Sequence, residues 1–104
     1  MTVSSSTLFQ STKVGPYELQ HRVVLAPLTR LRCDEEGVPK EIVSEYYKQR
    51  TTEGGLIITE ATSVSENAGA YPGGPGLFNE KQIQGWRKVV DTIHGNGGIA
   101  YSQL

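Results

Sequence analysis

Short apolar runs and longer stretches with helical spacing alternate along the chain. Residues 23–26 form one apolar run, residues 56–59 form a second, and a third begins within GGIAYSQL at the end of the sequence. The run LIIT is continuously apolar, which is typical of a strand covered on both faces. Strands that alternate with helices predict a parallel sheet with right-handed crossover connections.

The segment before the sheet is expected to form an N-terminal hairpin. A Gly-Pro pair at residues 15–16 precedes a short strand at residues 17–19, and a Gln-His pair at residues 20–21 is the expected turn into the strand at residues 22–26. Residues 1–12 are rich in Ser and Thr, and we expect them to be disordered.

Two helices are predicted from apolar spacing and from end signals. The first lies within PKEIVSEYYKQRTT, with Pro39 at the first helical position and Glu41 in the first turn. Its apolar stripe consists of Ile42, Val43, Tyr46, Tyr47 and Arg50. In the second helix Asn79 is the expected N-cap, and Gln82 completes a pair that resembles a capping box. The apolar face of this helix consists of Ile83, Trp86, Val89, Val90 and Ile93.

This unit is too small to close its own sheet. Its outer strands present unpaired backbone groups, and the last strand has no following helix to cover it. A (β/α)8 barrel takes on the order of 250 residues, whereas this chain has 104. We therefore predict an α/β fold that is an incomplete TIM barrel: the hairpin, the first three parallel strands and two helices, in one domain over residues 1–104.

Composition and charge exclude several classes of function. The net charge is −1 with acidic and basic residues mixed, so no basic stripe predicts nucleic-acid or membrane binding. The single cysteine, Cys33, cannot form an internal disulfide, and no Cys/His cluster has metal-site spacing. The first residues lack the pattern of a secretory signal, and we expect a cytoplasmic protein.

The candidate chemistry lies where the three strands end. If the strands are parallel, the sequences LAPLT, IITEA and YSQL end at one edge of the sheet, where α/β proteins bind ligands. Thr29 offers a hydroxyl there, Ala61 permits close backbone approach, and Gln103 offers an amide. This set suits one edge of a flat heteroaromatic ring, such as the pyrimidine edge of a flavin.

Each of these residues also has a plainer interpretation. Pro-Leu-Thr commonly only ends a strand, and an amide at a strand end is usually solvated. Glu60 follows an apolar strand, where it is either a buried functional group or, as we expect, the acceptor of structural hydrogen bonds. Cys33 has no base beside it in the sequence and is expected to be unreactive. The glycines of AGAYPGGPG match no phosphate-binding loop, although the segment 60–78 is longer than a turn requires.

Several motifs resemble the start of the Old Yellow Enzyme family, in its 12-oxophytodienoate reductase-like branch. They are HRVVLAPLTRLR, YYKQRTTEGGLIITEATSVS, AYPGGPGLF, the pattern Q..GW..VVD.IH..GG and the final QL. The resemblance implies an FMN-binding (β/α)8 barrel that oxidises NADPH and reduces activated alkenes such as enones. It further implies that Pro27, Leu28 and Thr29 lie beside the flavin, that Ala61 contacts it through the backbone, and that Gln103 bonds its pyrimidine edge.

The same resemblance implies that this chain contains no catalytic residue. The family's His-His or His-Asn pair that anchors the substrate, its proton-donating Tyr and the Arg that holds the FMN phosphate are absent from the 104 residues. The expected partners are therefore FMN, with NADPH and an enone only in a complete enzyme. The alternative is a non-catalytic module that associates with itself or a relative through its open strand edges.

Overall fold

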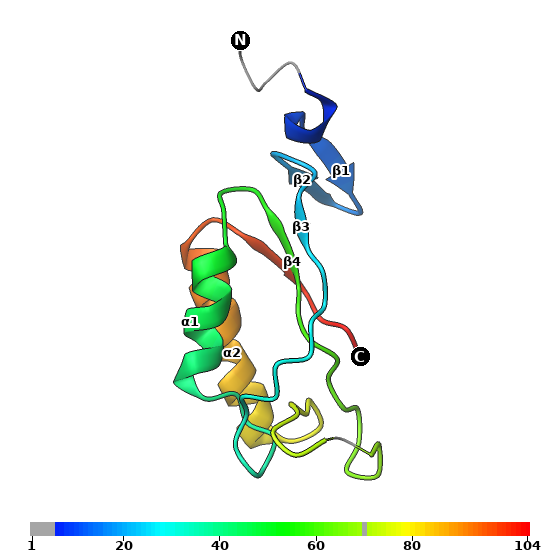
Figure 1. Cartoon of the computed structure of the whole chain (residues 1–104), viewed down its shortest axis with the longest axis vertical. Helices are drawn as coiled ribbons and strands as arrows, with labels where there is room; N and C mark the ends of the chain where they lie inside the picture. Colours follow the sequence, from blue (N-terminus) through cyan, green and yellow to red (C-terminus); the bar gives the residue numbers. More distant parts are fainter. Residues whose placement is uncertain (1–5, 70) are drawn as a thin grey trace.

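The computed structural model describes residues 6–69 and 71–104 (Figure 1). The elements in chain order are a 3-10 helix η2 (Thr7–Phe9), β1 (Thr12–Val14), β2 (Tyr17–Leu19), β3 (Val24–Leu25), α1 (Glu41–Arg50), β4 (Leu56–Ile58), α2 (Glu80–Gly95) and β5 (Ile99–Tyr101). No helix in this described part of the chain is long and apolar enough to cross a membrane.

Strands β3, β4 and β5 form one parallel sheet in that order, as the alternation of strands and helices predicted. Leu25 pairs with Ile57, and Ile57 pairs with Ala100, so the three strands run in register. Both helices lie side by side on the same side of this sheet (Figure 1). All three strands therefore end at the same edge, which is the arrangement that the candidate site requires.

The N-terminal hairpin pairs different residues from those we predicted. Strand β1 pairs antiparallel with β2, and the turn between them uses Gly15 with a φ of 56°. Glycine adopts this left-handed conformation without a steric penalty, so the turn forms there. The chain does bend at residues 20–22 on its way into β3, but β2 and β3 belong to different sheets and do not pair. The bend is held instead by later residues: the Gln20 N–H donates to the Gly54 carbonyl over 3.0 Å, and the His21 ring lies 2.7 Å from the Thr52 hydroxyl.

Residues 6–12 have a defined conformation, whereas we expected the first twelve residues to be disordered. They include η2 and the start of β1, and Arg22 holds them. Its backbone N–H donates to the Leu8 carbonyl over 2.9 Å, and its guanidinium donates to the carbonyls of Gln10 and Ser11. Residues 1–5, the remainder of that prediction, lie outside the described residues.

Helix α1 begins two residues later than predicted. Lys40 is its N-cap and has extended backbone, while Pro39 forms an isolated antiparallel bridge with Cys33 and so stays outside the helix. Of the predicted stripe, Val43 and Tyr47 are buried, whereas Ile42 and Arg50 are exposed. The predicted apolar stripe is therefore wider than the part of α1 that the rest of this chain covers.

Helix α2 begins as predicted, with a variation in its capping. The Asn79 side chain accepts a hydrogen bond from the Gln82 N–H over 3.0 Å, which confirms the N-cap. A capping box would return the Gln82 side chain to the Asn79 N–H. Here its oxygen instead accepts from the Phe78 N–H over 2.9 Å, and its amide nitrogen donates to the Glu36 carbonyl over 2.9 Å.

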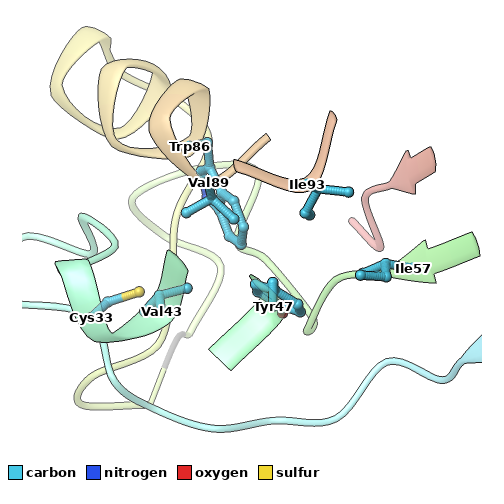
Figure 2. Packing of buried hydrophobic residues seen from close by; sticks show 7 residues of the cluster. All are labelled: Cys33, Val43, Tyr47, Ile57, Trp86, Val89 and Ile93. Carbon is cyan, nitrogen blue, oxygen red and sulfur yellow. The ribbon is translucent and has the colours of Figure 1, made fainter. Parts of the chain in front are cut away.

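The hydrophobic core lies between the two helices and the sheet. Figure 2 shows its seven buried members: Cys33, Val43, Tyr47, Ile57, Trp86, Val89 and Ile93. Trp86 fills the space between α2 and the long loop before it, and its indole N–H donates to the Gly76 carbonyl over 3.1 Å. This bond satisfies the polar atom that a buried tryptophan brings into a core.

The core predicts unequal effects for two isoleucines on one helix. Ile93 is 0% exposed and Ile83 is 39% exposed, and both lie on α2. Ile93→Ala should lower the free energy of unfolding by roughly 2–5 kcal/mol, because it removes buried methyl groups and leaves a cavity. Ile83→Ala, the matched control, should change it by well under half as much in urea unfolding. Equal losses would contradict this assignment of the core.

Candidate functional site

The structure places Thr29, Ala61 and Gln103 just past the ends of β3, β4 and β5, at one edge of the sheet. Thr29 and Ala61 line the same cavity, which has a volume of about 320 Å³, together with Leu104, the neighbour of Gln103. The sequence predicted this convergence from parallel strands alone.

Backbone hydrogen bonds continue the pairing of β4 and β5 beyond the strand ends. The Thr59 N–H donates to the Tyr101 carbonyl over 2.9 Å, and the Thr62 N–H donates to the Gln103 carbonyl over 3.0 Å. Gln103 is thereby held beside the segment that carries Ala61, while its side chain is exposed. An exposed amide at this position is free to donate to and accept from a ligand.

The long loop between β4 and α2 supplies most of the remaining cavity wall. It contributes Ser63, Val64, Ala68, Gly69, Tyr71, Gly74 and Pro75, and the loop before α1 contributes Leu31. A parallel bridge between Ser63 and Gly76 holds the two arms of the loop together. Sequence reasoning marked this loop by its length and did not identify these lining residues, because their positions depend on how the loop folds.

Gln103 is not among the residues that line this cavity, and neither are two further predicted residues, Pro27 and Leu28. They continue the chain from β3 toward Thr29, and the Leu28 side chain is exposed. Thr29 is therefore the only one of the three consecutive residues that the described structure brings to the cavity. The predicted contact of Pro27 and Leu28 with a flavin stays a prediction.

The chemistry of the cavity suits a neutral planar group better than a phosphate or a metal ion. None of the described residues that line it is charged, and small side chains such as Ala61 and Ala68 permit close approach. The Thr29 hydroxyl and backbone groups of the cavity wall could bond the carbonyl and N–H groups along one edge of a ring. In the described part of the chain no three His, Cys, Asp or Glu side chains gather as metal ligands.

Glu60 connects two of the strand ends from behind the cavity. Its side chain is 1% exposed, and Oε2 accepts hydrogen bonds from the Arg30 N–H over 3.0 Å and the Leu31 N–H over 3.3 Å. Its backbone N–H donates to the Tyr47 hydroxyl over 2.9 Å. This arrangement bears out the expectation of a structural hydrogen-bonding role for Glu60.

Burial in this region raises the pKa values of two weakly acidic side chains. Burial raises the pKa of the Cys33 thiol from 9.0 to about 12, and the negative charges of Glu60 and Asp34 add to the effect. Burial also raises the pKa of the Tyr47 hydroxyl from 10.0 to about 12, against the opposing hydrogen bond from the Glu60 backbone. A thiol with so high a pKa is a poor nucleophile at neutral pH, as the sequence interpretation of Cys33 expected.

We expect stability to fall between about pH 9 and pH 12. In this range the unfolded chain releases the protons of Cys33 and Tyr47 while the folded chain keeps them, so rising pH favours the unfolded state. The stabilisation is complete below pH 9 and is lost as the pH rises through the folded pKa values. Cys33→Ala should therefore flatten the decline measured by urea unfolding.

Val43→Ala is the matched control for that measurement, because it weakens the same core without removing a titrating group. It should lower the free energy of unfolding at every pH and leave the slope against pH unchanged. The assignment would be contradicted by a Cys33→Ala variant whose slope equals that of the unmodified chain.

Comparison with known proteins identifies the family. The family model described as NADH:flavin oxidoreductase / NADH oxidase matches residues 7–104. The chain is 48% identical over 101 residues to the flavin oxidoreductase hxnT of Emericella nidulans, covering 93% of this chain and 26% of that protein. It is also 48% identical over 97 residues to 12-oxophytodienoate reductase 7 of Oryza sativa subsp. japonica, covering 93% of this chain and 24% of that protein.

A solved structure agrees with the sequence relatives. The Old Yellow Enzyme from Pichia sp. AKU4542 superimposes with a TM-score of 0.93 and 36% identity, covering 99% of this chain and 27% of that chain. The present chain therefore belongs to the NADH:flavin oxidoreductase / NADH oxidase family, of the Old Yellow Enzyme type. It spans about a quarter of the length of these relatives.

Proposed function

We propose that this chain forms the part of an FMN-dependent ene-reductase that binds one edge of the flavin ring. The observation that carries the proposal is the cavity shared by Thr29 and Ala61 at the carboxyl ends of adjacent parallel strands. In a chain of this family, three such strands and two helices would be the first part of a (β/α)8 barrel. Barrels of this kind bind their ligands at that edge.

In the proposed site each residue makes a different contact with FMN. The Thr29 hydroxyl donates to a ring carbonyl, the backbone at Ala61 lies against the ring, and the Gln103 amide bonds the pyrimidine edge. Pro27 and Leu28 flank the ring beside Thr29. Bound FMN would supply the hydride chemistry, which in the proposed enzyme oxidises NADPH and reduces an activated alkene such as an enone. The contribution of these residues is to hold and orient the ring.

The same proposal assigns no catalytic residue to this chain. By the family resemblance, a His-His or His-Asn pair would anchor the substrate carbonyl, a Tyr would deliver the proton and an Arg would hold the FMN phosphate. None of these motifs lies within the 104 residues. We therefore expect the chain by itself to bind FMN weakly and to catalyse no turnover.

Binding of FMN by the chain itself tests the proposal. In proton–nitrogen correlation NMR, added FMN should shift the amide signals of Thr29, Ala61 and Gln103. Thr29→Val and Gln103→Ala should each weaken the fitted affinity by roughly three- to tenfold, since each removes one hydrogen bond. Thr92→Val and Gln84→Ala, which alter a half-buried and an exposed side chain on α2, are the matched controls. Equal affinities in all four variants would contradict the proposed contacts.

A second candidate function is association through the open edge of β3. Val23 and Val24 are 50% and 39% exposed there, next to an apolar hollow of about 480 Å³ that Phe9 and Leu56 help to line. β3 pairs with β4 on one side and with no described strand on the other. An exposed apolar edge of this kind favours pairing with another chain. Sedimentation velocity would then show a dimer that Val23→Lys dissociates, and a monomer at all concentrations would exclude this candidate.

A further inference from the structure

The carboxylate of Glu60 is bonded to the segment that directly follows Thr29. Oε2 accepts from the backbone N–H groups of Arg30 and Leu31 over 3.0 and 3.3 Å. Glu60 belongs to the end of β4, whereas Thr29 to Leu31 continue the chain beyond β3. One buried side chain therefore ties together the two strand ends that line the cavity.

The segment it holds has an unfavourable backbone conformation at Leu31. With a φ of 57°, Leu31 is the one non-glycine residue in the described chain that has a positive φ. A leucine keeps this conformation only where its surroundings impose it. Gly73 packs closely against this segment, since a Cβ at Gly73 would lie 2.6 Å from the Leu31 carbonyl oxygen. The segment is thus clamped between the Glu60 carboxylate and the Gly73 backbone.

The backbone of Glu60 is held by two hydrogen bonds, but only one of its two carboxylate oxygens has a hydrogen-bond partner. Its backbone N–H donates to the Tyr47 hydroxyl over 2.9 Å, and its backbone carbonyl accepts from the Thr62 hydroxyl over 2.8 Å. Oε1 is buried and has no hydrogen-bond partner among the described residues. A buried carboxylate oxygen with no hydrogen-bond partner carries a desolvation cost that nothing in the described structure offsets. Its contribution is therefore to position the backbone rather than to raise stability.

We propose that Glu60 is a positioning residue that acts through Thr29. Its carboxylate imposes the conformation of residues 29–31 and so keeps Thr29 in the wall of the cavity. The consequence for FMN rests on the proposed function, whereas the effect on the backbone does not. The two parts can therefore be tested separately.

The backbone effect is measured by amide hydrogen exchange followed by NMR. Glu60→Met should speed exchange of the Arg30 and Leu31 amides by about tenfold or more, because a charge-assisted acceptor is lost. The Gln20 amide, which donates to the Gly54 carbonyl, should exchange as before. The three-bond amide-to-Hα coupling of Leu31 should also change, as its φ leaves the left-handed region.

Gln82→Met is the matched control for Glu60→Met. Gln82 is equally buried, and its side-chain oxygen also accepts from a backbone N–H, that of Phe78, but it makes no hydrogen bond to residues 29–31. Its replacement should leave the Leu31 coupling and the exchange of residues 30 and 31 within about twofold of the original values. An equal disturbance of Leu31 by both variants would assign Glu60 a general structural role and overturn the proposal.

Two conservative variants keep the test decisive if Glu60→Met fails to fold. Glu60→Gln retains an acceptor oxygen and should preserve the Leu31 coupling. Glu60→Asp retains the charge but withdraws the carboxylate by one methylene group, and should speed exchange at residues 30 and 31. Loss of the left-handed Leu31 in Glu60→Gln together with its preservation in Glu60→Asp would contradict the positioning role.

A double-mutant cycle tests whether Glu60 acts on FMN through Thr29. Glu60→Asp should weaken FMN binding by about threefold or more in the unmodified chain, and by less in the Thr29→Val background. Equal effects in both backgrounds would refute action through Thr29. If no variant bound FMN, the proposed function would fail, while the exchange and coupling data would still decide whether Glu60 positions residues 29–31.

Discussion

The hydrogen bond between the Glu60 backbone N–H and the Tyr47 hydroxyl connects the hydrophobic core to the edge of the sheet that carries the candidate site. Tyr47 belongs to α1 and lies within the hydrophobic core (Figure 2). Glu60 follows β4, and its carboxylate accepts from the backbone N–H groups of Arg30 and Leu31. The core therefore determines where the edge of the sheet can lie. Because both groups are buried, neither can exchange its partner for water without a loss of stability.

Further contacts lead from this hydrogen bond to the residues of the candidate site. The Glu60 carboxylate holds residues 30 and 31, and those residues limit the position of Thr29. Ala61 is the next residue after Glu60, and the backbone at Thr62 holds Gln103. Thr29, Ala61 and Gln103 are thus all reached from the end of β4, which is the central strand of the sheet. A central strand is the best support for a site because it has a paired neighbour on each side.

Much of the fold could be predicted from the sequence because its signals are local. The continuous apolar run at residues 56–59 marked a covered strand, Asn79 marked the start of α2, and the alternation of elements marked the parallel sheet. The errors arose where local signals compete. Gly15 rather than residues 20–21 makes the hairpin turn, and Pro39 pairs with Cys33 instead of starting α1. At residues 20–21 hydrogen bonds with Gly54 and Thr52, far along the chain, selected one of two locally acceptable conformations, and at Pro39 the bridge with Cys33 did so.

The candidate site, like the fold, has features that the sequence determined and features that only the tertiary structure decided. By itself the sequence determined that a hydroxyl, a small residue and an amide follow three strands, and parallel pairing makes such positions neighbours. Only the tertiary structure decided that Glu60 bonds the backbone after Thr29, that Leu31 is left-handed and that the long loop forms the cavity wall. These features depend on side-chain direction and on contacts between residues some thirty positions apart. A local pattern of residue types does not specify either of them.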